Sequence, residues 1–195
     1  MDTVNPHQEL LTRLFAIAKK RQFGSRVINW QFGSVNADMA ALARGNSRDE
    51  YLVHATVGKM FAIFHTGSST VLSGVEDKNI GDTLRNVGYY SEPAVKRLYE
   101  RLITASRLSE LHDVLIDITK QLRSVSRGSG KPWMSPNWLL LLDDLDQWLD
   151  SNQRDNVRLR WAQQFLTWNN KTTDSTTDDH SSDDANDGQQ LHINI

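Results

Sequence analysis

The segment 132–168 constrains the fold most strongly, because two amphipathic helical patterns follow each other there with only a short polar interruption. Apolar residues at i, i+3, i+4 and i+7 mark one face of a helix. The first pattern places six residues on such a face: Trp138, Leu141, Leu142, Leu145, Trp148 and Leu149. The second places four residues on one stripe: Val157, Trp161, Phe165 and Trp168. Helices with a short connection pack antiparallel, so the segment predicts a helical hairpin.

Polar residues define the ends of these two helices. Ser135 is a candidate N-cap, and Pro136 suits the first helical position because a missing N–H costs nothing there. Residues 151–153 break the apolar pattern and predict the turn. The remaining faces carry opposite charges, with aspartates on the first helix and arginines on the second: Asp143, Asp144, Asp146 and Asp150, then Arg154, Arg158 and Arg160.

The rest of the chain shows the same helical periodicity and no convincing strand pattern. We expect further helices over 5–23, 37–45, 48–65, 80–87, 93–105 and 107–125. Asn36 and Ser47 are candidate N-caps, and Gly88 and Pro93 predict a break between the fourth and fifth of these helices. The segment 25–35 is expected to be irregular, with Trp30 and Phe32 packed on the core. The class is therefore all-α, with about eight helices in two small helical bundles.

Composition shifts suggest where the chain divides. Residues 68–79 are rich in small and polar residues and predict a linker or loop between an N-terminal helical domain, 1–67, and a C-terminal helical bundle, 80–168. Residues 169–195 carry six aspartates against one lysine and almost no apolar side chains, which predicts a disordered acidic tail. Without that tail, 21 basic and 18 acidic residues remain, so the folded body carries a net charge of about +3.

Several classes of protein are disfavoured. The chain contains no cysteine, which excludes disulfides and thiolate metal sites. It has no apolar run of the length that a membrane span needs, and we expect a cytoplasmic protein without a signal peptide and without a membrane partner. It also lacks the HExxH, Walker and GxSxG motifs, so we expect no enzymatic activity and no cofactor.

Two clusters of ionisable residues are explained by packing or solvation, without a metal or catalytic site. His54 and His65 lie near one helical face without a Glu or Asp ligand in the same pattern, which favours packing residues over a metal site. Asp143, Asp144 and Asp146 are residues of the type that a metal-dependent nuclease uses, but neighbouring helical residues diverge by about 100°. A solvated face paired with arginines is favoured instead, so we expect no metal and no catalytic residue.

The order of several short motifs resembles the CasB family, the small subunit of the type I-E CRISPR surveillance complex, Cascade. The motifs are Ala40–Arg44, Met60-Phe61, Ile80-Gly81-x-x-Leu84, Arg97-Leu98-Tyr99, Trp148 and Val157-Arg158-x-Arg160-Trp161-Ala162. They cover roughly residues 36–168, and their order and spacing are more specific than any motif alone. The acidic tail is not part of the family pattern.

The resemblance implies a non-catalytic scaffold that binds the displaced non-target DNA strand and stabilises the R-loop in antiviral defence. Its implied partners are the backbone and large Cascade subunits, a second copy of itself, guide RNA and target DNA. Six basic residues match or nearly match basic positions of the family and are the predicted nucleic-acid-binding residues: Arg44, Arg48, Lys59, Arg97, Arg101 and Arg158. The alternative is a helical protein–protein adaptor, in which these residues pair with acidic groups instead of phosphates.

Overall fold

The chain forms an all-α fold. The structure, a computed structural model, describes residues 5–19, 25–43, 47–68, 70–126 and 134–167. Within these ranges there are no strands, which confirms the predicted class, while the tail 169–195 lies outside them. The described ranges contain eight α-helices: α1 (Pro6–Lys19), α2 (Ser25–Ile28), α3 (Ala37–Leu42), α4 (Arg48–His65), α5 (Ile80–Thr104), α6 (Leu108–Ser126), α7 (Trp138–Leu149) and α8 (Arg154–Leu166).

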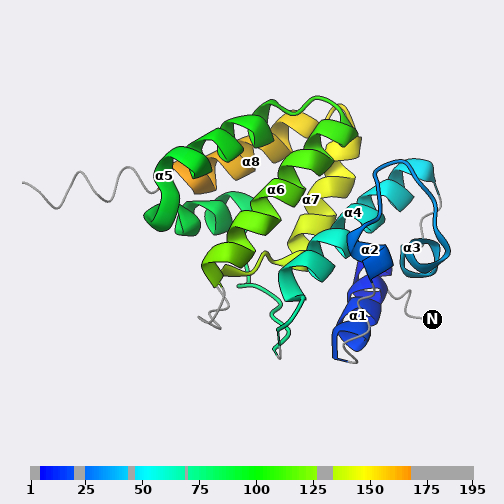
Figure 1. Ribbon diagram of the computed structural model, residues 1–195. Helices are drawn as coiled ribbons and strands as arrows, with labels where there is room; N and C mark the ends of the chain where they lie inside the picture. Colours follow the sequence, from blue (N-terminus) through cyan, green and yellow to red (C-terminus); the bar gives the residue numbers. More distant parts are fainter. Residues whose placement is uncertain (1–4, 20–24, 44–46, 69, 127–133, 168–195) are drawn as a thin grey trace, which may run out of the picture.

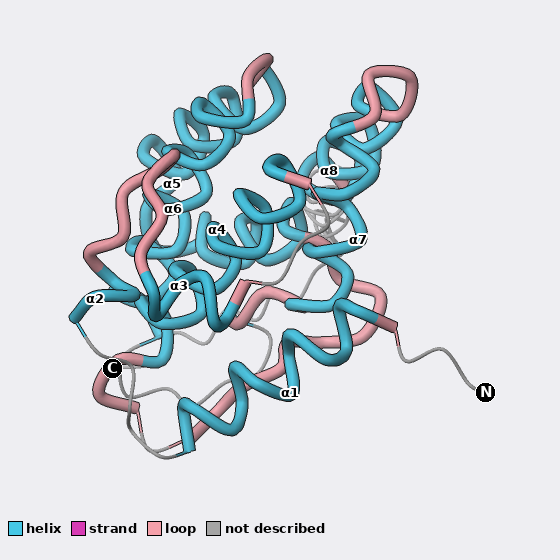
Figure 2. The backbone as a smooth tube through the Cα atoms, turned by 90° about the vertical axis from the view of Figure 1, so that its right-hand side faces the viewer, coloured by secondary structure: helices cyan, strands magenta, loops and turns pink. Residues whose placement is uncertain are grey.

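Helices α4 and α7 lie in the middle of the molecule. Figure 1 shows α1, α2 and α3 gathered on one side of this pair and α5, α6 and α8 on the other. Helix α4 packs against both α6 and α7, and α5 packs against α6 and α8 (Figures 1 and 2). Helices α7 and α8 contact each other and form the hairpin predicted from residues 132–168. No helix in the described ranges is long and apolar enough to cross a membrane.

The predicted N-caps of two helices are confirmed. The Asn36 side chain accepts a hydrogen bond from the Met39 N–H at 2.7 Å and begins α3. At α4, Ser47 accepts from the Glu50 N–H, and the Glu50 carboxylate accepts from the Ser47 N–H, which completes a capping box. These local bonds satisfy N–H groups that have no partner within the helix, so the sequence alone located these starts.

The predicted break between residues 87 and 93 is wrong. Residues 80–104 form one continuous helix, α5, with Pro93 inside it. A proline in a helix interior removes one hydrogen bond and costs about 3 kcal/mol. Helix α5 packs against both α6 and α8, and this tertiary contact offsets the local cost.

The short helix α2 also differs from the prediction, because residues 25–28 are helical where an irregular segment was expected.

The start of α7 also differs from the prediction. Asn137, not Ser135, is the N-cap, and its side chain accepts a hydrogen bond from the Leu140 N–H at 3.1 Å. The Ser135 hydroxyl donates instead to the Leu72 carbonyl. Ser135 therefore contacts the loop between α4 and α5, and its partner lies 63 residues away, where no local sequence pattern reveals it.

The loop 70–79, predicted as part of a linker, is fixed to the rest of the fold. The Trp138 indole donates to the Leu72 carbonyl at 2.9 Å, and the Leu72 N–H donates to His65 Nε2 at 3.0 Å. Gly74 has a φ of +84°, and a Cβ built there would lie 2.4 Å from the Pro136 carbonyl oxygen. Only glycine meets both conditions, a left-handed backbone and a close approach. The loop therefore docks on the start of α7.

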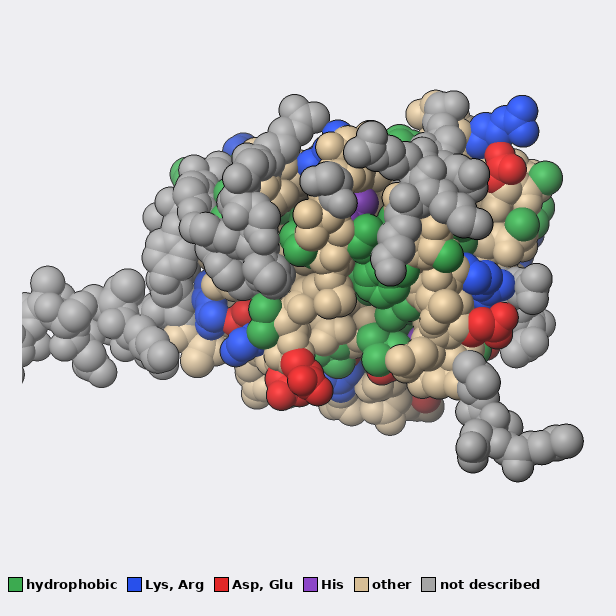
Figure 3. All heavy atoms as spheres, turned by 90° about the horizontal axis from the view of Figure 1, so that it is seen from below, with side chains coloured by type: hydrophobic (Ala, Val, Ile, Leu, Met, Phe, Trp, Pro, Cys, Tyr) green, Lys and Arg blue, Asp and Glu red, His purple; other side chains and the backbone are tan. Residues whose placement is uncertain are grey.

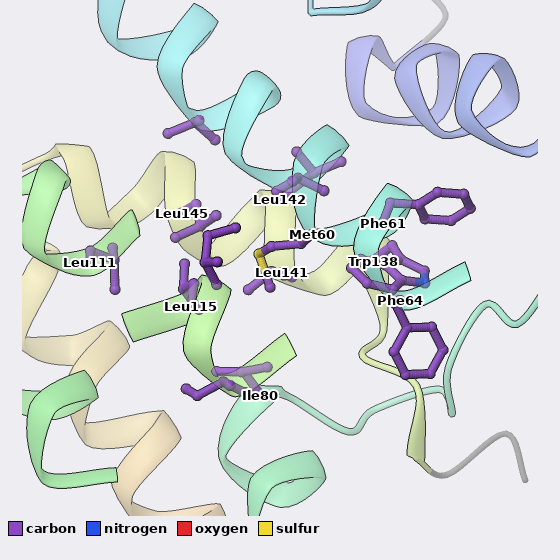
Figure 4. Close-up of a cluster of buried hydrophobic side chains, with 14 of the residues drawn as sticks. Met60, Phe61, Phe64, Ile80, Leu111, Leu115, Trp138, Leu141, Leu142 and Leu145 are labelled. Atoms are coloured by element: carbon purple, nitrogen blue, oxygen red, sulfur yellow. The ribbon is translucent and has the colours of Figure 1, made fainter. Parts of the chain in front are cut away.

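One cluster of buried side chains extends through both halves of the chain. Figure 4 shows Met60 of α4 beside Leu141 of α7, with Leu115 of α6 near them, and Phe61 of α4 near Trp138 of α7. The predicted core tryptophans on the hairpin are buried: Trp138, Trp148 and Trp161. Trp30 is also buried and Phe32 packs against the cluster, as expected. Leu159 and Leu166, by contrast, are about half exposed (55% and 48%).

Candidate nucleic-acid interface

The predicted binding residues of the first half occupy different environments. Arg48 is the first residue of α4 and is exposed. Lys59 lies in the second half of α4 and is only partly exposed; its ammonium donates to the Trp30 carbonyl at 2.5 Å. Burial lowers the pKa of Lys59, and the charge of Lys120 adds to this effect. Arg44 lies outside the described residues.

The predicted residues of α5 differ in their pairing. Arg97 is exposed and forms no hydrogen bond or ion pair with another described residue, and the same holds for its neighbour Lys96. Arg101 pairs with Asp117 of α6, with its Nη1 3.0 Å from the carboxylate. Asp117 also pairs with Lys120. Arg97 therefore presents its charge to solvent, whereas the charge of Arg101 is partly compensated.

Arg158 has a structural role in the fold. Its guanidinium donates to the Ala105 carbonyl and to Asp155, and the side chain is only 23% exposed. Arg154, one turn earlier, donates to the Ser106 and Trp148 carbonyls and covers the Trp148 ring at 4.2 Å. Both arginines thus fasten α8 to the turn between α5 and α6. A phosphate contact by Arg158 would compete with these internal bonds.

The fold brings Arg101 and Arg158 close to a common point, the end of α5. Arg101 and Ala105 line a shallow hollow whose other lining residues include Glu110 and Asp113. Among the described residues, Lys59 and Arg101 have internal partners at different places, the Trp30 carbonyl and Asp117. On the face shown in Figure 3, basic and acidic side chains lie side by side at several places and do not gather into one basic patch.

Asp144 corrects the prediction of a solvated acidic face on the hairpin. It is 1% exposed, and its carboxylate accepts hydrogen bonds from Arg160 and from the Trp161 indole, both at 2.6 Å. Burial raises the pKa of Asp144, while the bonds from Arg160 and Trp161 oppose that rise. The prediction of pairing with arginine is confirmed, but the pair joins α7 to α8 in the interior and is not a surface ion pair.

A second group was missed by the sequence analysis. His7, in the first turn of α1, lies between Asp143 and Asp146 of α7: its Nδ1 is 2.6 Å from Asp143 Oδ1 and its Nε2 is 2.7 Å from Asp146 Oδ2. The hydrogen bond to Asp146 raises the pKa of His7, burial opposes it, and the bond to Asp143 reinforces it. His54 of α4 lies beside them. The expectation that no carboxylate is near His54 is therefore wrong. Only the i, i+3 spacing of the two aspartates could have indicated a shared face.

The family model for the CRISPR-associated protein Cse2 matches residues 19–166 of the chain, which include α2 to α8. No curated protein and no solved structure shows a significant match. The matched range covers most of the chain and confirms the resemblance found in the motifs around Trp148, Arg158 and Trp161. The chain therefore belongs to the Cse2 family, also called CasB, whose members are structural subunits of the CRISPR Cascade complex.

Proposed function

We propose that this Cascade subunit is non-catalytic, scaffolds the complex and binds the displaced non-target DNA strand, which stabilises the R-loop. The observation that carries the proposal is the family match over residues 19–166. The proposed partners are the backbone and large Cascade subunits, a second copy of the chain, guide RNA and target DNA. The six predicted residues, Arg44, Arg48, Lys59, Arg97, Arg101 and Arg158, remain the proposed nucleic-acid contacts.

The exposed basic residues support the electrostatic part of this proposal. Sequence-independent binding of a single strand relies on phosphate contacts, and these become weaker as salt rises. Arg48 and Arg97 are exposed and unpaired among the described residues, so they offer charges that no internal carboxylate compensates. We rank these two above Arg101 and Arg158, whose guanidinium groups already have internal partners.

A second candidate is an adaptor that contacts other Cascade subunits without touching nucleic acid. The observation in its favour is that Lys59, Arg101 and Arg158 all have partners inside the fold. Positive charge on the surface would then serve complementarity to acidic groups of other subunits. This candidate predicts that the variants below weaken the assembly of Cascade and that DNA does not crosslink to this subunit.

The test uses Cascade reconstituted with the full-length chain and a double-stranded target. The paired substitutions Arg48→Gln and Arg97→Gln should lower R-loop stability several-fold at about 150 mM salt, because phosphate contacts are lost. The slope of log affinity against log salt should fall by up to about 0.7 for each single-strand contact removed. Crosslinking of the non-target strand to the subunit reports the same contact directly.

Arg26→Gln is the control for each single substitution, Arg48→Gln or Arg97→Gln, because each removes one positive charge. Arg26 is exposed, carries the same charge and pairs with Asp38 at 3.6 Å. We expect this variant to behave as the wild type. A loss in Arg26→Gln equal to that in each single substitution would point to net charge as the cause, and weakened assembly together with no crosslink would favour the adaptor.

A further inference from the structure

Three helices that are distant in sequence bring two imidazoles and a carboxylate together. His7 lies in the first turn of α1, His54 in α4 and Asp146 in α7. One ligand atom from each lies within 4.8 Å of the other two, and the histidines are only 8% and 3% exposed. We propose that His7, His54 and Asp146 bind one divalent transition-metal ion of the Zn²⁺ class.

The donor set is suited to such an ion. Two imidazole nitrogens and one carboxylate oxygen are typical protein ligands of Zn²⁺, whereas Mg²⁺ and Ca²⁺ prefer sites built from oxygen alone. Ligand atoms around a tetrahedral zinc lie about 3.4 Å apart, given bonds of about 2.1 Å. Separations of up to 4.8 Å would therefore have to shorten by as much as about 1.4 Å, and the 2.7 Å between His7 Nε2 and Asp146 Oδ2 would have to lengthen by about 0.7 Å, which rotation of the side chains can supply.

Asp143 supplies the outer contact that metal-bound histidines usually have. Its Oδ1 lies 2.6 Å from His7 Nδ1, on the side of the ring opposite to Asp146. A histidine that binds a metal through one nitrogen commonly donates its other N–H to a carboxylate, which fixes the tautomer and the ring orientation. Here the ion would replace the proton between His7 Nε2 and Asp146, while the bond to Asp143 stays intact.

The second oxygen of Asp146 also points to a cation. Asp146 Oδ1 is buried and has no hydrogen-bond partner among the described residues, although Oδ2 contacts His7. A buried carboxylate oxygen without a partner is costly, because it has lost water and gained nothing in return. A metal ion at this position would satisfy it. The unpartnered Asp146 Oδ1 and the contact between Asp143 and His7 thus support the proposal independently of the distances that define the cluster.

The expected consequence is structural. The ion would fasten α1 to α4 and α7, the two helices in the middle of the fold. His54 and Asp146 lie within the matched family range 19–166, but His7 lies outside it. The site is therefore a feature of how α1 docks and does not follow from family membership. The proposal is also independent of DNA binding, since none of the residues proposed to bind DNA contributes a ligand.

The competing explanation for the same geometry is an ion pair without metal, in which protonated His7 bridges Asp143 and Asp146. The test starts with full-length protein treated with a chelator and then incubated with one equivalent of Zn²⁺ at pH 7.5. After desalting, the retained metal is measured by mass spectrometry. We expect about one Zn²⁺ per wild-type chain and a loss of at least ten-fold in His54→Gln and in Asp146→Asn.

His65→Gln is the control, since His65 is buried in the same helix but lies outside the cluster. It should retain zinc as the wild type does. A readout that needs no variant is Co²⁺ added to the wild-type protein, where a tetrahedral site gives strong visible absorption that Zn²⁺ then abolishes. Absent absorption with no retained zinc would overturn the proposal in favour of the ion pair. Equal zinc retention in all variants would also overturn it, because the ion would then bind elsewhere.

Discussion

His65 and His112 are held as neutral imidazoles in the interior. His65 Nδ1 lies 2.9 Å from the Phe61 carbonyl, while its Nε2 accepts from the Leu72 N–H. His112 Nδ1 lies 3.0 Å from the hydroxyl of Thr56, a hydroxyl that itself donates to a backbone carbonyl. Burial lowers the pKa of each histidine to about 4, and for His112 the charge of Lys59 contributes to the shift. Protonation would place a positive charge on an imidazole that is buried away from water.

The two histidines predict that the protein loses stability in mild acid. Each has a folded-state pKa of about 4, below the value of 6.5 expected in the unfolded chain. Between these values the unfolded state binds more protons, so the free energy of unfolding falls as the pH falls from about 6.5 to about 4. Each group contributes at most about 1.4 kcal/mol per pH unit, and the contribution is fully present above pH 6.5.

Urea unfolding at several values between pH 5 and pH 6 measures this slope. His65→Gln and His112→Gln should each reduce the slope by roughly half, even where the variant is less stable at pH 7.5. The comparison of slopes separates titration from lost packing. An unchanged slope in both variants would show that other groups take up the protons.

The contrast between Arg97 and Arg158 shows what the sequence could predict about the candidate site. Both were predicted as phosphate contacts because they match basic positions of the CasB family. Arg97 is exposed, but Arg158 reaches the Ala105 carbonyl, a backbone atom 53 residues away. The sequence shows which residues are basic, whereas their pairing depends on the tertiary fold. His7 was missed for the same reason, since its carboxylates lie 136 and 139 residues away.

At the scale of the helices, a substitution at Pro93 tests whether α5 is one continuous helix. Pro93 is exposed within a helix of 25 residues, so Pro93→Ala restores a backbone donor without removing a core contact. We expect the free energy of unfolding to rise by about 1–3 kcal/mol, as measured by chemical denaturation. The control is Pro6→Ala at the first position of α1, where we expect a change within about 0.5 kcal/mol. Equal effects would contradict a continuous helix.

Gly81 sets how closely α5 approaches α8. A Cβ at Gly81 would lie 2.1 Å from the Trp161 carbonyl oxygen, and a backbone atom cannot move aside as a side chain can. Asn79 reinforces this contact by donating to the Arg160 carbonyl at 3.1 Å. Gly81→Ala should therefore destabilise the protein by about 2–3 kcal/mol. At Gly58 the nearest neighbours of a Cβ would be side-chain atoms, a methyl group of Leu42 at 3.0 Å and the Met39 sulfur at 3.7 Å, so Gly58→Ala should change stability by about 1 kcal/mol or less.

Chemical denaturation of both glycine variants checks this difference. Equal losses would mean that α8 adjusts to the added methyl group.

The helix ends that could be predicted from the sequence are those fixed by local hydrogen bonds. Ser47 and Asn36 act on N–H groups three residues away, so the pattern is visible in the sequence. The continuity of α5 depends on packing against α6 and α8, which no local signal contains.

At the scale of the whole molecule, the two predicted halves share one core. Phe61 and Phe64 of α4 contact the Trp138 ring of α7, at centroid distances of 5.1 Å and 5.9 Å. Arg123 of α6 donates to the Thr66 carbonyl at the end of α4. The division at residues 68–79 was predicted from composition alone, and it remains a prediction about how the chain is organised. Composition reports where a segment is polar, but it does not report what packs across that segment.

The shared core predicts that the described helices unfold as one cooperative unit. Removing α4 would expose the apolar faces of α6 and α7 together, so neither half retains a complete core alone. Hydrogen exchange monitored by mass spectrometry at increasing denaturant measures the opening free energy of each helix separately. We expect α4, α6 and α7 to converge on one value with the same denaturant dependence. Two values, with α4 opening before α6 and α7, would support two domains joined at 68–79. Phe61→Ala gives the matched perturbation: in a single unit, a loss of about 3–5 kcal/mol should appear equally in peptides from α4 and from α6.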